Sequence, residues 1–140
     1  MSESVTAQRS ILIVEDDPEG RSTLERLFRR EGFQTEAVEN GIEAFAAVSR
    51  RRYDVVLLDI RMPGLGGVGF FEQAEERFPN IASRTVFVTA YAQAPEIAKF
   101  LKKTGQPVFE KPYDITRLVE TTRAIAAQRN SSPHERMEDD

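Results

Sequence analysis

Five polar or charged side chains lie at the ends of short apolar runs, and together they suit phosphoryl chemistry. Glu15 and Asp16 follow ILIV, Asp59 follows VVLL, Thr89 follows VFV, and Lys111 follows PVFE. The carboxyl ends of parallel strands meet at one edge of a sheet, so these residues can converge although they are far apart in the sequence. Three carboxylates, a hydroxyl and an ammonium group fit a phosphoryl group better than other common ligands.

The acidic residues of this set predict a magnesium site. Three carboxylates in one crevice repel one another unless a cation joins them. Mg²⁺ prefers hard oxygen ligands, usually one or two carboxylates with water and phosphate completing the shell. We expect Asp16 and Asp59 to ligate Mg²⁺ directly and Glu15 to act through water. The backbone carbonyl of Arg61 is expected to add a further oxygen.

Asp59 is the predicted nucleophile of this site. A carboxylate can attack phosphorus and form an aspartyl phosphate. Phosphoryl transfer needs in-line positioning and neutralisation of the equatorial oxygens, which Lys111 and Thr89 would supply with the metal. Pro112 is expected to hold a cis bond that aims Lys111 inward. Each residue alone has an ordinary explanation as a helix cap, strand-end hydroxyl or loop cation, and their joint placement at four strand ends carries the prediction.

The elements that position these residues follow from two alternating periodicities. Short apolar runs predict strands at 10–15, 34–38, 54–58, 84–89 and 107–110, and the polar second run predicts an edge strand. The stretches between them predict helices, one behind Asp17 with Pro18 at its first position and others at 41–51 behind Asn40, 67–78 ended by Pro79, 94–104 ended by Gly105, and 114–128 behind Asp114. This alternation predicts an α/β fold, a flavodoxin-like doubly wound (βα)5 three-layer sandwich whose parallel sheet has the order 2-1-3-4-5.

Apolar residues at helical spacing predict the faces that these helices bury. The predicted buried residues are Leu24, Leu27 and Phe28 in the first helix, Ile42, Phe45, Ala46 and Val48 in the second, Phe70, Phe71, Ala74 and Phe78 in the third, and Ile115, Leu118, Val119 and Ile125 in the fifth.

The composition of the chain argues against several classes of function. The chain has 140 residues, no cysteine and a formal net charge of −4, which argues against nucleic-acid binding, disulfides and thiol catalysis. Arginines at 29–30 and 50–52 fall at predicted helix ends, where they complement the helix dipole. No apolar run is long enough to span a membrane and the first ten residues carry no signal-peptide pattern, so we expect a cytoplasmic location. We expect a flexible segment at 1–9, one domain at 10–129 and a disordered acidic tail at 130–140, whose His134 is neither a phosphodonor nor a ligand.

Four motifs in order, ILIVEDD, VVLLDIRMPGLGG, VFVTAYA and PVFEKPYD, together resemble the receiver domains of two-component response regulators. Arg21 also follows Asp16 at the family's interval, and the resemblance covers about residues 10–128. It implies that Asp59 accepts a phosphoryl group from a histidine kinase or a histidine phosphotransfer protein, with Mg²⁺ required. Glu15 and Asp16 match the family's acidic pair. Thr89 matches its switch hydroxyl and Lys111 its lysine.

The chain departs from the family pattern at three places. An aromatic residue often stands three positions before the lysine, where this chain has Val108, so the usual coupling of threonine to an aromatic ring is in question. Arg61 and Tyr91, each two positions beyond a site residue, are hypothesised to shield the acyl phosphate and slow its hydrolysis. The GLGG loop lacks an acidic residue that the family often carries, without an expected functional consequence. The stretch 99–114 also resembles receivers attached to hybrid histidine kinases.

Signal output is expected from a protein-binding surface, because about ten residues after the last helix are too few for a DNA-binding domain. We expect the face of the fourth predicted helix, fifth strand and fifth helix to bind a protein partner, with Tyr91, Ala94 and Lys99 near it, and no nucleic acid or membrane. In the family this face also forms dimers, so a homodimer is an open alternative, as is a domain cut from a longer protein.

Two other functions compete with the phosphorylated receiver, which would act only on its own phosphorylation and dephosphorylation. A constitutive scaffold would need none of the five site groups. A phosphohydrolase of the haloacid dehalogenase type would need an Asp two residues after the nucleophile, where this chain has Arg61.

Overall fold

The computed structural model describes residues 8–61 and 66–128, and within them five parallel strands form one sheet. The predicted tail with His134, the first seven residues and the Gly64-Leu65 part of the GLGG loop lie outside the described residues. The sheet order, β2-β1-β3-β4-β5, confirms the predicted fold and places the polar strand β2 at an edge. The strands are β1 (Ser10–Val14), β2 (Gln34–Val38), β3 (Val55–Ile60), β4 (Thr85–Thr89) and β5 (Val108–Glu110).

The helices begin at the capping residues that the sequence indicates. The side chain of Asp17 accepts a hydrogen bond from the backbone N–H of Gly20, and Asn40 and Asp114 cap their helices in the same way. Gly105 ends its helix with φ 73°, a left-handed conformation that favours glycine. The helices are α1 (Pro18–Arg30), α2 (Gly41–Arg50), α3 (Gly67–Arg77), α4 (Pro79–Ala82), α5 (Pro95–Thr104) and α6 (Ile115–Ala126).

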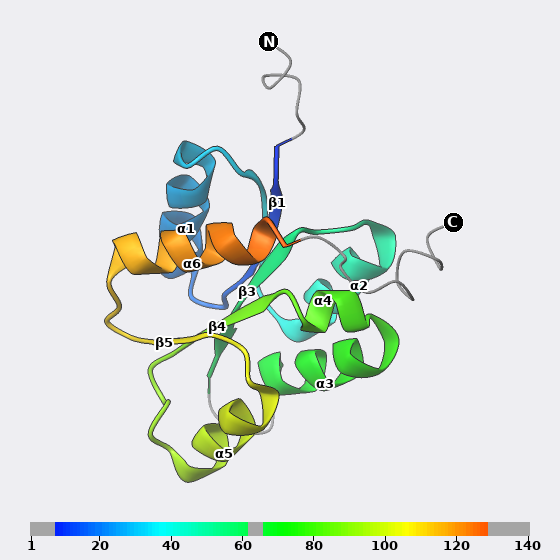
Figure 1. Cartoon of the computed structure of the whole chain (residues 1–140), viewed down its shortest axis with the longest axis vertical. Coiled ribbons are helices and arrows are strands. Elements are labelled where there is room, and N and C mark those ends of the chain that lie inside the picture. The colour runs from blue at the N-terminus through cyan, green and yellow to red at the C-terminus, as the bar shows by residue number, and fades with distance from the viewer. Residues whose placement is uncertain (1–7, 62–65, 129–140) are drawn as a thin grey trace.

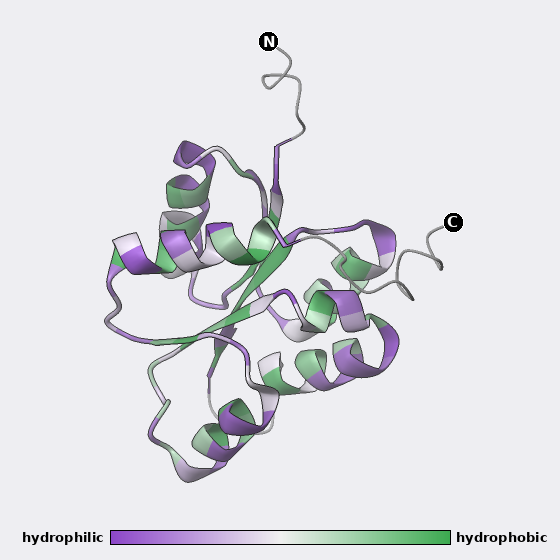
Figure 2. Ribbon diagram, in the orientation of Figure 1, coloured by the Kyte–Doolittle hydropathy of each residue, from purple (hydrophilic) through white to green (hydrophobic). Residues whose placement is uncertain are grey.

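The helices form two layers around the sheet. The α1 and α6 helices lie on one face, and α2, α3, α4 and α5 cover the other (Figure 1). Because side chains alternate along a strand, Ile11 and Ile13 pack under α1 and α6 while Leu12 and Val14 pack under the other layer. The strands are apolar on both faces, as Figure 2 shows for β1 and β3, which is typical of a parallel sheet covered on both sides. Within the described ranges, no helix is long and apolar enough to cross a membrane.

Two of the predicted buried helix faces were partly wrong. Ile42 is 83% exposed and Ala46 is exposed, whereas Ala44 and Ala47 are buried against the sheet. Small alanine side chains let the backbone of α2 approach the strands, so the helix turns this face inward. Ile115 is 54% exposed because it begins α6 beyond the sheet, and burial starts one turn later. The four-residue helix α4 was not predicted; Pro79 begins it as well as following α3.

Polar contacts tie the sheet together at the end opposite the predicted site. The backbone N–H and hydroxyl of Ser10 both donate to Asp54 Oδ2, at 2.8 and 3.2 Å. In return, the backbone N–H of Asp54 donates to the Ser10 hydroxyl at 3.1 Å. The guanidinium of Arg84 donates to the carbonyl oxygens of Asp54 and Gln128, at 3.2 and 2.6 Å. These bonds join the starts of three strands to the end of α6.

Candidate functional site

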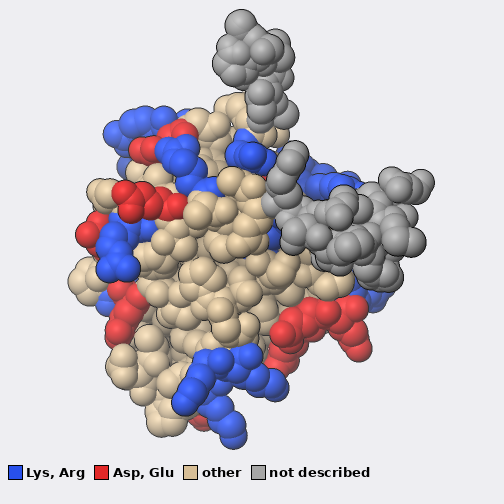
Figure 3. Space-filling view, in the orientation of Figure 1, with Lys and Arg blue, Asp and Glu red and all other residues tan. Residues whose placement is uncertain are grey.

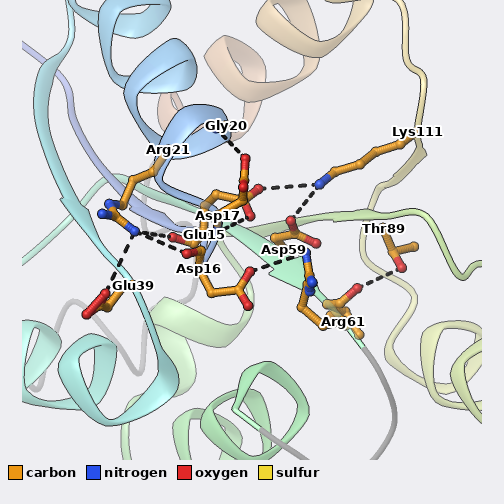
Figure 4. Close-up of polar contacts among 11 residues, drawn as sticks. Glu15, Asp16, Asp17, Gly20, Arg21, Glu39, Asp59, Arg61, Thr89 and Lys111 are labelled. Atoms are coloured by element: carbon orange, nitrogen blue, oxygen red, sulfur yellow. Dashed lines mark hydrogen bonds and ion pairs between the residues drawn. The ribbon is translucent and has the colours of Figure 1, made fainter.

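The carboxyl ends of β1 and β3 bring two acidic side chains together below the surface. Val14 pairs with Leu58 in the parallel register, so Glu15, which follows β1, and Asp59, the next residue of β3, lie side by side (Figure 4). Glu15 is 2% exposed and Asp59 is 7% exposed. Two carboxylates buried side by side require a positive charge nearby, and a lysine that follows β5 supplies it.

Lys111 is the cation that reaches both acids. Its Nζ lies 2.6 Å from Asp59 Oδ2 and 3.4 Å from Glu15 Oε1. The peptide bond between Lys111 and Pro112 is cis, as the sequence led us to expect, and the backbone N–H of Lys111 donates to the carbonyl oxygen of Thr89 at 2.9 Å. Residues at the carboxyl ends of β1, β3 and β5 therefore meet at one point of the crevice.

The pKa values of this cluster follow from burial and charge. Burial raises the pKa of Glu15 to about 7, and the neighbouring Asp59 carboxylate adds to the rise. Burial alone would lower the pKa of Lys111. The hydrogen bond and the charge of Asp59, together with Glu15, outweigh that effect, so the pKa of Lys111 lies above its ordinary value. The ammonium group therefore stays charged at neutral pH and offsets the buried acids.

The two oxygens of the Asp59 carboxylate differ in their surroundings. Among the described residues, Oδ1 of Asp59 is buried and accepts no hydrogen bond. An orphaned carboxylate oxygen is costly unless a ligand binds it. Asp59 also lines a cavity of about 430 Å³, together with Asp16, Arg61 and the glycines at 41, 66 and 67. This unpaired oxygen and the cavity that Asp59 lines fit a hard cation or a phosphoryl group.

Asp16 and Arg61 form an ion pair at the mouth of the crevice. The Nη1 atom of Arg61 lies 3.4 Å from Oδ1 of Asp16, and both side chains are about half exposed (52% and 49%). Each carboxylate of the predicted metal site thus has a cation beside it. In the part of the chain that the structure describes, no three His, Cys, Asp or Glu side chains are arranged to hold a metal ion. Mg²⁺ commonly uses one or two carboxylates plus water, so the donor set still fits this ion.

Thr89 lies at the end of β4, and its hydroxyl is bound to backbone groups. The side chain is fully buried, and Oγ1 donates to the carbonyl oxygen of Ile60 at 2.8 Å. The same oxygen accepts a hydrogen bond from the backbone N–H of Tyr91 at 2.8 Å. The hydroxyl therefore lies next to the end of β3, one residue beyond Asp59, without contacting its carboxylate (Figure 4).

Arg21 supports the acidic loop, a role that sequence reasoning missed. Its Nη1 donates to the carbonyl oxygens of Glu15 and Asp16, at 3.0 and 3.4 Å, and lies 4.0 Å from Glu39 Oε1. The backbone N–H of Asp17 also donates to Glu15 Oε2 at 3.0 Å. These contacts hold the turn between β1 and α1. The sequence signals were its place in the first turn of the helix and its interval from Asp16, and neither indicated this contact.

Comparisons with known proteins agree on the nature of this domain. The family model described as response regulator receiver domain matches residues 11–123. Sporulation initiation phosphotransferase F of Bacillus subtilis is 34% identical over 108 residues, which cover 77% of this chain and 86% of that protein. The DNA-binding transcriptional regulator NtrC of Salmonella typhimurium is 33% identical over 113 residues, 80% of this chain but only 24% of that protein.

A solved structure carries the same fold. The receiver domain of sensor histidine kinase PA1611 from Pseudomonas aeruginosa, solved with a magnesium ion coordinated in its active site cleft, superposes with a TM-score of 0.75. The two are 26% identical, and the match covers 87% of this chain and all (100%) of that one. With the β2-β1-β3-β4-β5 sheet and the acidic crevice at its carboxyl edge, the match over 11–123 shows that this chain belongs to the family of response regulator receiver domains.

Proposed function

We propose that the chain accepts a phosphoryl group on Asp59 from the phosphohistidine of a histidine kinase or a histidine phosphotransfer protein, in a step that requires Mg²⁺. The observation that carries this proposal is the state of the Asp59 carboxylate. One oxygen is bound to Lys111 at 2.6 Å, the other is buried with no hydrogen-bond partner among the described residues, and the residue lines a cavity. Such a carboxylate is held in place and has a free lone pair, which a nucleophile needs.

The transfer forms one bond and breaks one. A carboxylate oxygen of Asp59 attacks the phosphorus atom, the phosphorus–nitrogen bond of the phosphohistidine breaks, and the imidazole leaves with the electron pair and takes up a proton. Charge on the equatorial phosphoryl oxygens must be neutralised while this happens. The ammonium group of Lys111, 2.6 Å from Asp59, is placed to bind one of those oxygens.

The acidic residues of the crevice are the proposed metal ligands. Asp16 and Asp59 would bind Mg²⁺ directly, Glu15 through water, and the backbone carbonyl of Arg61 would add an oxygen. When bound, Mg²⁺ offsets the negative charge that the carboxylates and the phosphoryl group bring together. The magnesium ion in the cleft of the PA1611 receiver supports this assignment by similarity.

Thr89 is the proposed link to a partner-binding surface. On phosphorylation its hydroxyl would leave the carbonyl oxygen of Ile60 for a phosphoryl oxygen and draw the loop before α5 with it.

We place the partner-binding face on α5, β5 and α6, with Tyr91, Ala94 and Lys99 on or near it. Basic side chains gather over α5 in Figure 3, where Lys99, Lys102 and Lys103 are exposed, so an acidic protein surface would complement it. The same face would serve a homodimer.

Arg61 and Tyr91 are proposed to shield the acyl phosphate from water. Both side chains are exposed, Arg61 lines the cavity with Asp59, and the backbone of Tyr91 is fixed by its bond to Thr89. The half-life of the phosphorylated protein in Arg61→Asn and Tyr91→Ala variants tests this. Shielding requires a shorter half-life in each variant, and unchanged half-lives would refute it.

The phosphoacceptor itself is tested by intact mass after incubation with acetyl phosphate and Mg²⁺. The wild type should gain one phosphoryl group (~80 Da), and Asp59→Asn should gain none. Asp114→Asn is the matched control, because it changes a helix cap outside the crevice to another capping residue. No gain in the wild type, together with no binding of beryllofluoride, would leave the constitutive scaffold as the function. The proposed domain spans residues 10–129, and a cytoplasmic location stays a prediction.

A further inference from the structure

Arg61 pairs with the carboxylate of Asp16, which the proposed metal site needs as a ligand. Its guanidinium lies 3.4 Å from Oδ1 of Asp16, although the two residues follow different strands, β3 and β1. Figure 4 shows the pair bridging the two loops at the crevice. We propose that Arg61 competes with Mg²⁺ for Asp16 and so raises the metal concentration at which the crevice fills. This inference rests on the metal site proposed above.

The strand geometry explains why Arg61 reaches this carboxylate. Side chains alternate along a strand, and Leu57 packs in the core under α1 and α6. Asp59, two residues later, lies on the same side and ends in the crevice. Arg61 follows the last residue of β3, so its long side chain is free of the core. The register of β1 with β3 places Asp16, two residues beyond Val14, within its reach.

Arg61 can leave its carboxylate for Mg²⁺ more easily than Lys111 can. Lys111 contacts carboxylates whose side chains are 1% and 3% exposed, so its contacts are largely withdrawn from solvent. The pair of Arg61 and Asp16 is about half exposed on both sides and can open by rotation of surface side chains. Mg²⁺ and a guanidinium bound to one carboxylate repel each other, so metal binding at Asp16 favours the open pair.

The expected size of the competition is modest. Exposed ion pairs commonly contribute little free energy. If the pair of Arg61 and Asp16 must be broken before Mg²⁺ binds, this contribution lowers the affinity for Mg²⁺ about 1.5- to 5-fold. Repulsion between Mg²⁺ and the nearby guanidinium adds to this change, so we expect the upper part of the range.

Calorimetric titration of the unphosphorylated protein with Mg²⁺ in about 0.15 M KCl tests the proposal, because charges more than about 8 Å apart are then largely screened. Arg61→Ala should bind Mg²⁺ about 2- to 5-fold more tightly than the wild type. The matched control is Arg50→Ala. Arg50 also forms a surface ion pair, 3.5 Å from Glu36 with 60% of its side chain exposed, and its removal changes the net charge equally. Arg50→Ala should bind Mg²⁺ as the wild type does.

A second measurement follows the arginine itself. In the wild type, the Nε–H NMR signal of Arg61 should move as Mg²⁺ is added, while that of Arg50 should not. Equal Mg²⁺ affinity in Arg61→Ala and the wild type, or an equal gain in Arg50→Ala, overturns the competition while the metal site stands. If the wild type and both variants bind no Mg²⁺ at all, the metal site fails and the inference fails with it.

Discussion

The hydroxyl of Thr89 donates a hydrogen bond to the carbonyl oxygen of Ile60 across neighbouring ends of β4 and β3. The same hydroxyl accepts from the backbone N–H of Tyr91, at the start of the segment that leads to α5. One buried side chain thus connects the residue after the proposed phosphoacceptor to the proposed output surface. Any movement of this hydroxyl toward a phosphoryl group must break the bond to Ile60.

Replacing Thr89 separates its structural role from its signalling role. We expect Thr89→Val to unfold at lower urea concentration, with a loss of about 1 to 3 kcal/mol, because the N–H of Tyr91 and the carbonyl of Ile60 lose their buried partner. Thr89→Ser keeps the hydroxyl and should lose less. Amide NMR spectra with beryllofluoride should show shifts in α5 for Thr89→Ser but not for Thr89→Val. A valine variant as stable as the wild type would contradict the role of this bond.

Lys111→Met should weaken binding of a phosphoryl analogue without preventing folding. A hydrogen bond to a charged group contributes about 1.5 to 3 kcal/mol, so we expect beryllofluoride affinity to fall about 10- to 150-fold. Titration in the presence of Mg²⁺, followed by amide NMR signals, measures this. Lys103→Met on the exposed side of α5 is the control. If the two variants bind equally well, the ammonium group of Lys111 does not contact the bound group.

Thr122 carries a buried hydroxyl for which the described residues supply no hydrogen-bond partner, although its side chain is fully buried in α6. Thr122→Val keeps the shape and removes the unsatisfied oxygen, so we expect a gain of about 1 kcal/mol in the free energy of unfolding. Thr121→Val, at a half-buried neighbouring position, should change stability by less. Urea denaturation of the three proteins decides the matter, and a loss of stability in Thr122→Val would indicate an unrecognised partner.

Gly41 and Gly69 should respond to alanine in opposite directions. A Cβ at Gly41 would overlap the backbone carbonyl of Gly66, where the loop after β3 meets the start of α2. We expect Gly41→Ala to lose about 1 to 3 kcal/mol, since backbone must shift to relieve the overlap. Gly69 is exposed in α3 with nothing near its Cβ position, so Gly69→Ala should gain roughly 0.5 to 1 kcal/mol. Chemical denaturation compares both with the wild type.

Tyr53 should make stability depend on pH in alkaline solution. Burial raises the pKa of Tyr53, and its hydrogen bond to Glu36 at 2.5 Å raises it further. Because the pKa of Tyr53 is higher in the folded protein than in the unfolded chain, the protonated side chain stabilises the fold. This stabilisation is complete below the ordinary pKa of about 10 and is lost as the pH rises through the pKa of the folded protein. The wild type should therefore lose about 1.4 kcal/mol per pH unit above pH 10 relative to Tyr53→Phe. Parallel curves for the two proteins would rule this out.

Most of the fold could be predicted from the sequence, and so could the meeting of Glu15, Asp59 and Lys111 at one edge of the sheet. The strand order follows from the alternation of strands and helices and the right-handed crossovers that join them. The helix starts rest on local patterns, since the caps Asp17, Asn40 and Asp114 lie where polar residues precede apolar periodicity. Ile42 and Ile115 were misplaced because both stand in the first turn of a helix, and periodicity does not tell how far the sheet extends beneath that turn. The helix α4 has four residues, too few for a periodic signal.

The side-chain pairings within the site could not be predicted. The spacing of motifs brings Asp16 and Arg61 to one edge, but whether a long exposed side chain contacts a carboxylate depends on rotamers rather than on sequence position. The bond from Thr89 to Ile60 likewise depends on the register of β4 against β3. The donation of Arg21 to two carbonyl oxygens left no pattern of its own in the sequence.

The reciprocal bonds of Ser10 and Asp54 lie at the opposite end of the sheet from the crevice. Selection on the two ends is therefore separable. We expect substitutions at Ser10, Asp54 and Arg84 to change thermal stability without altering the charges around Asp59, whereas stabilising changes inside a functional site tend to cost activity. A lineage adapting to warmer surroundings, or an engineer who needs a more stable scaffold, can change the residues at this end of the sheet and leave the proposed phosphoryl site unaltered.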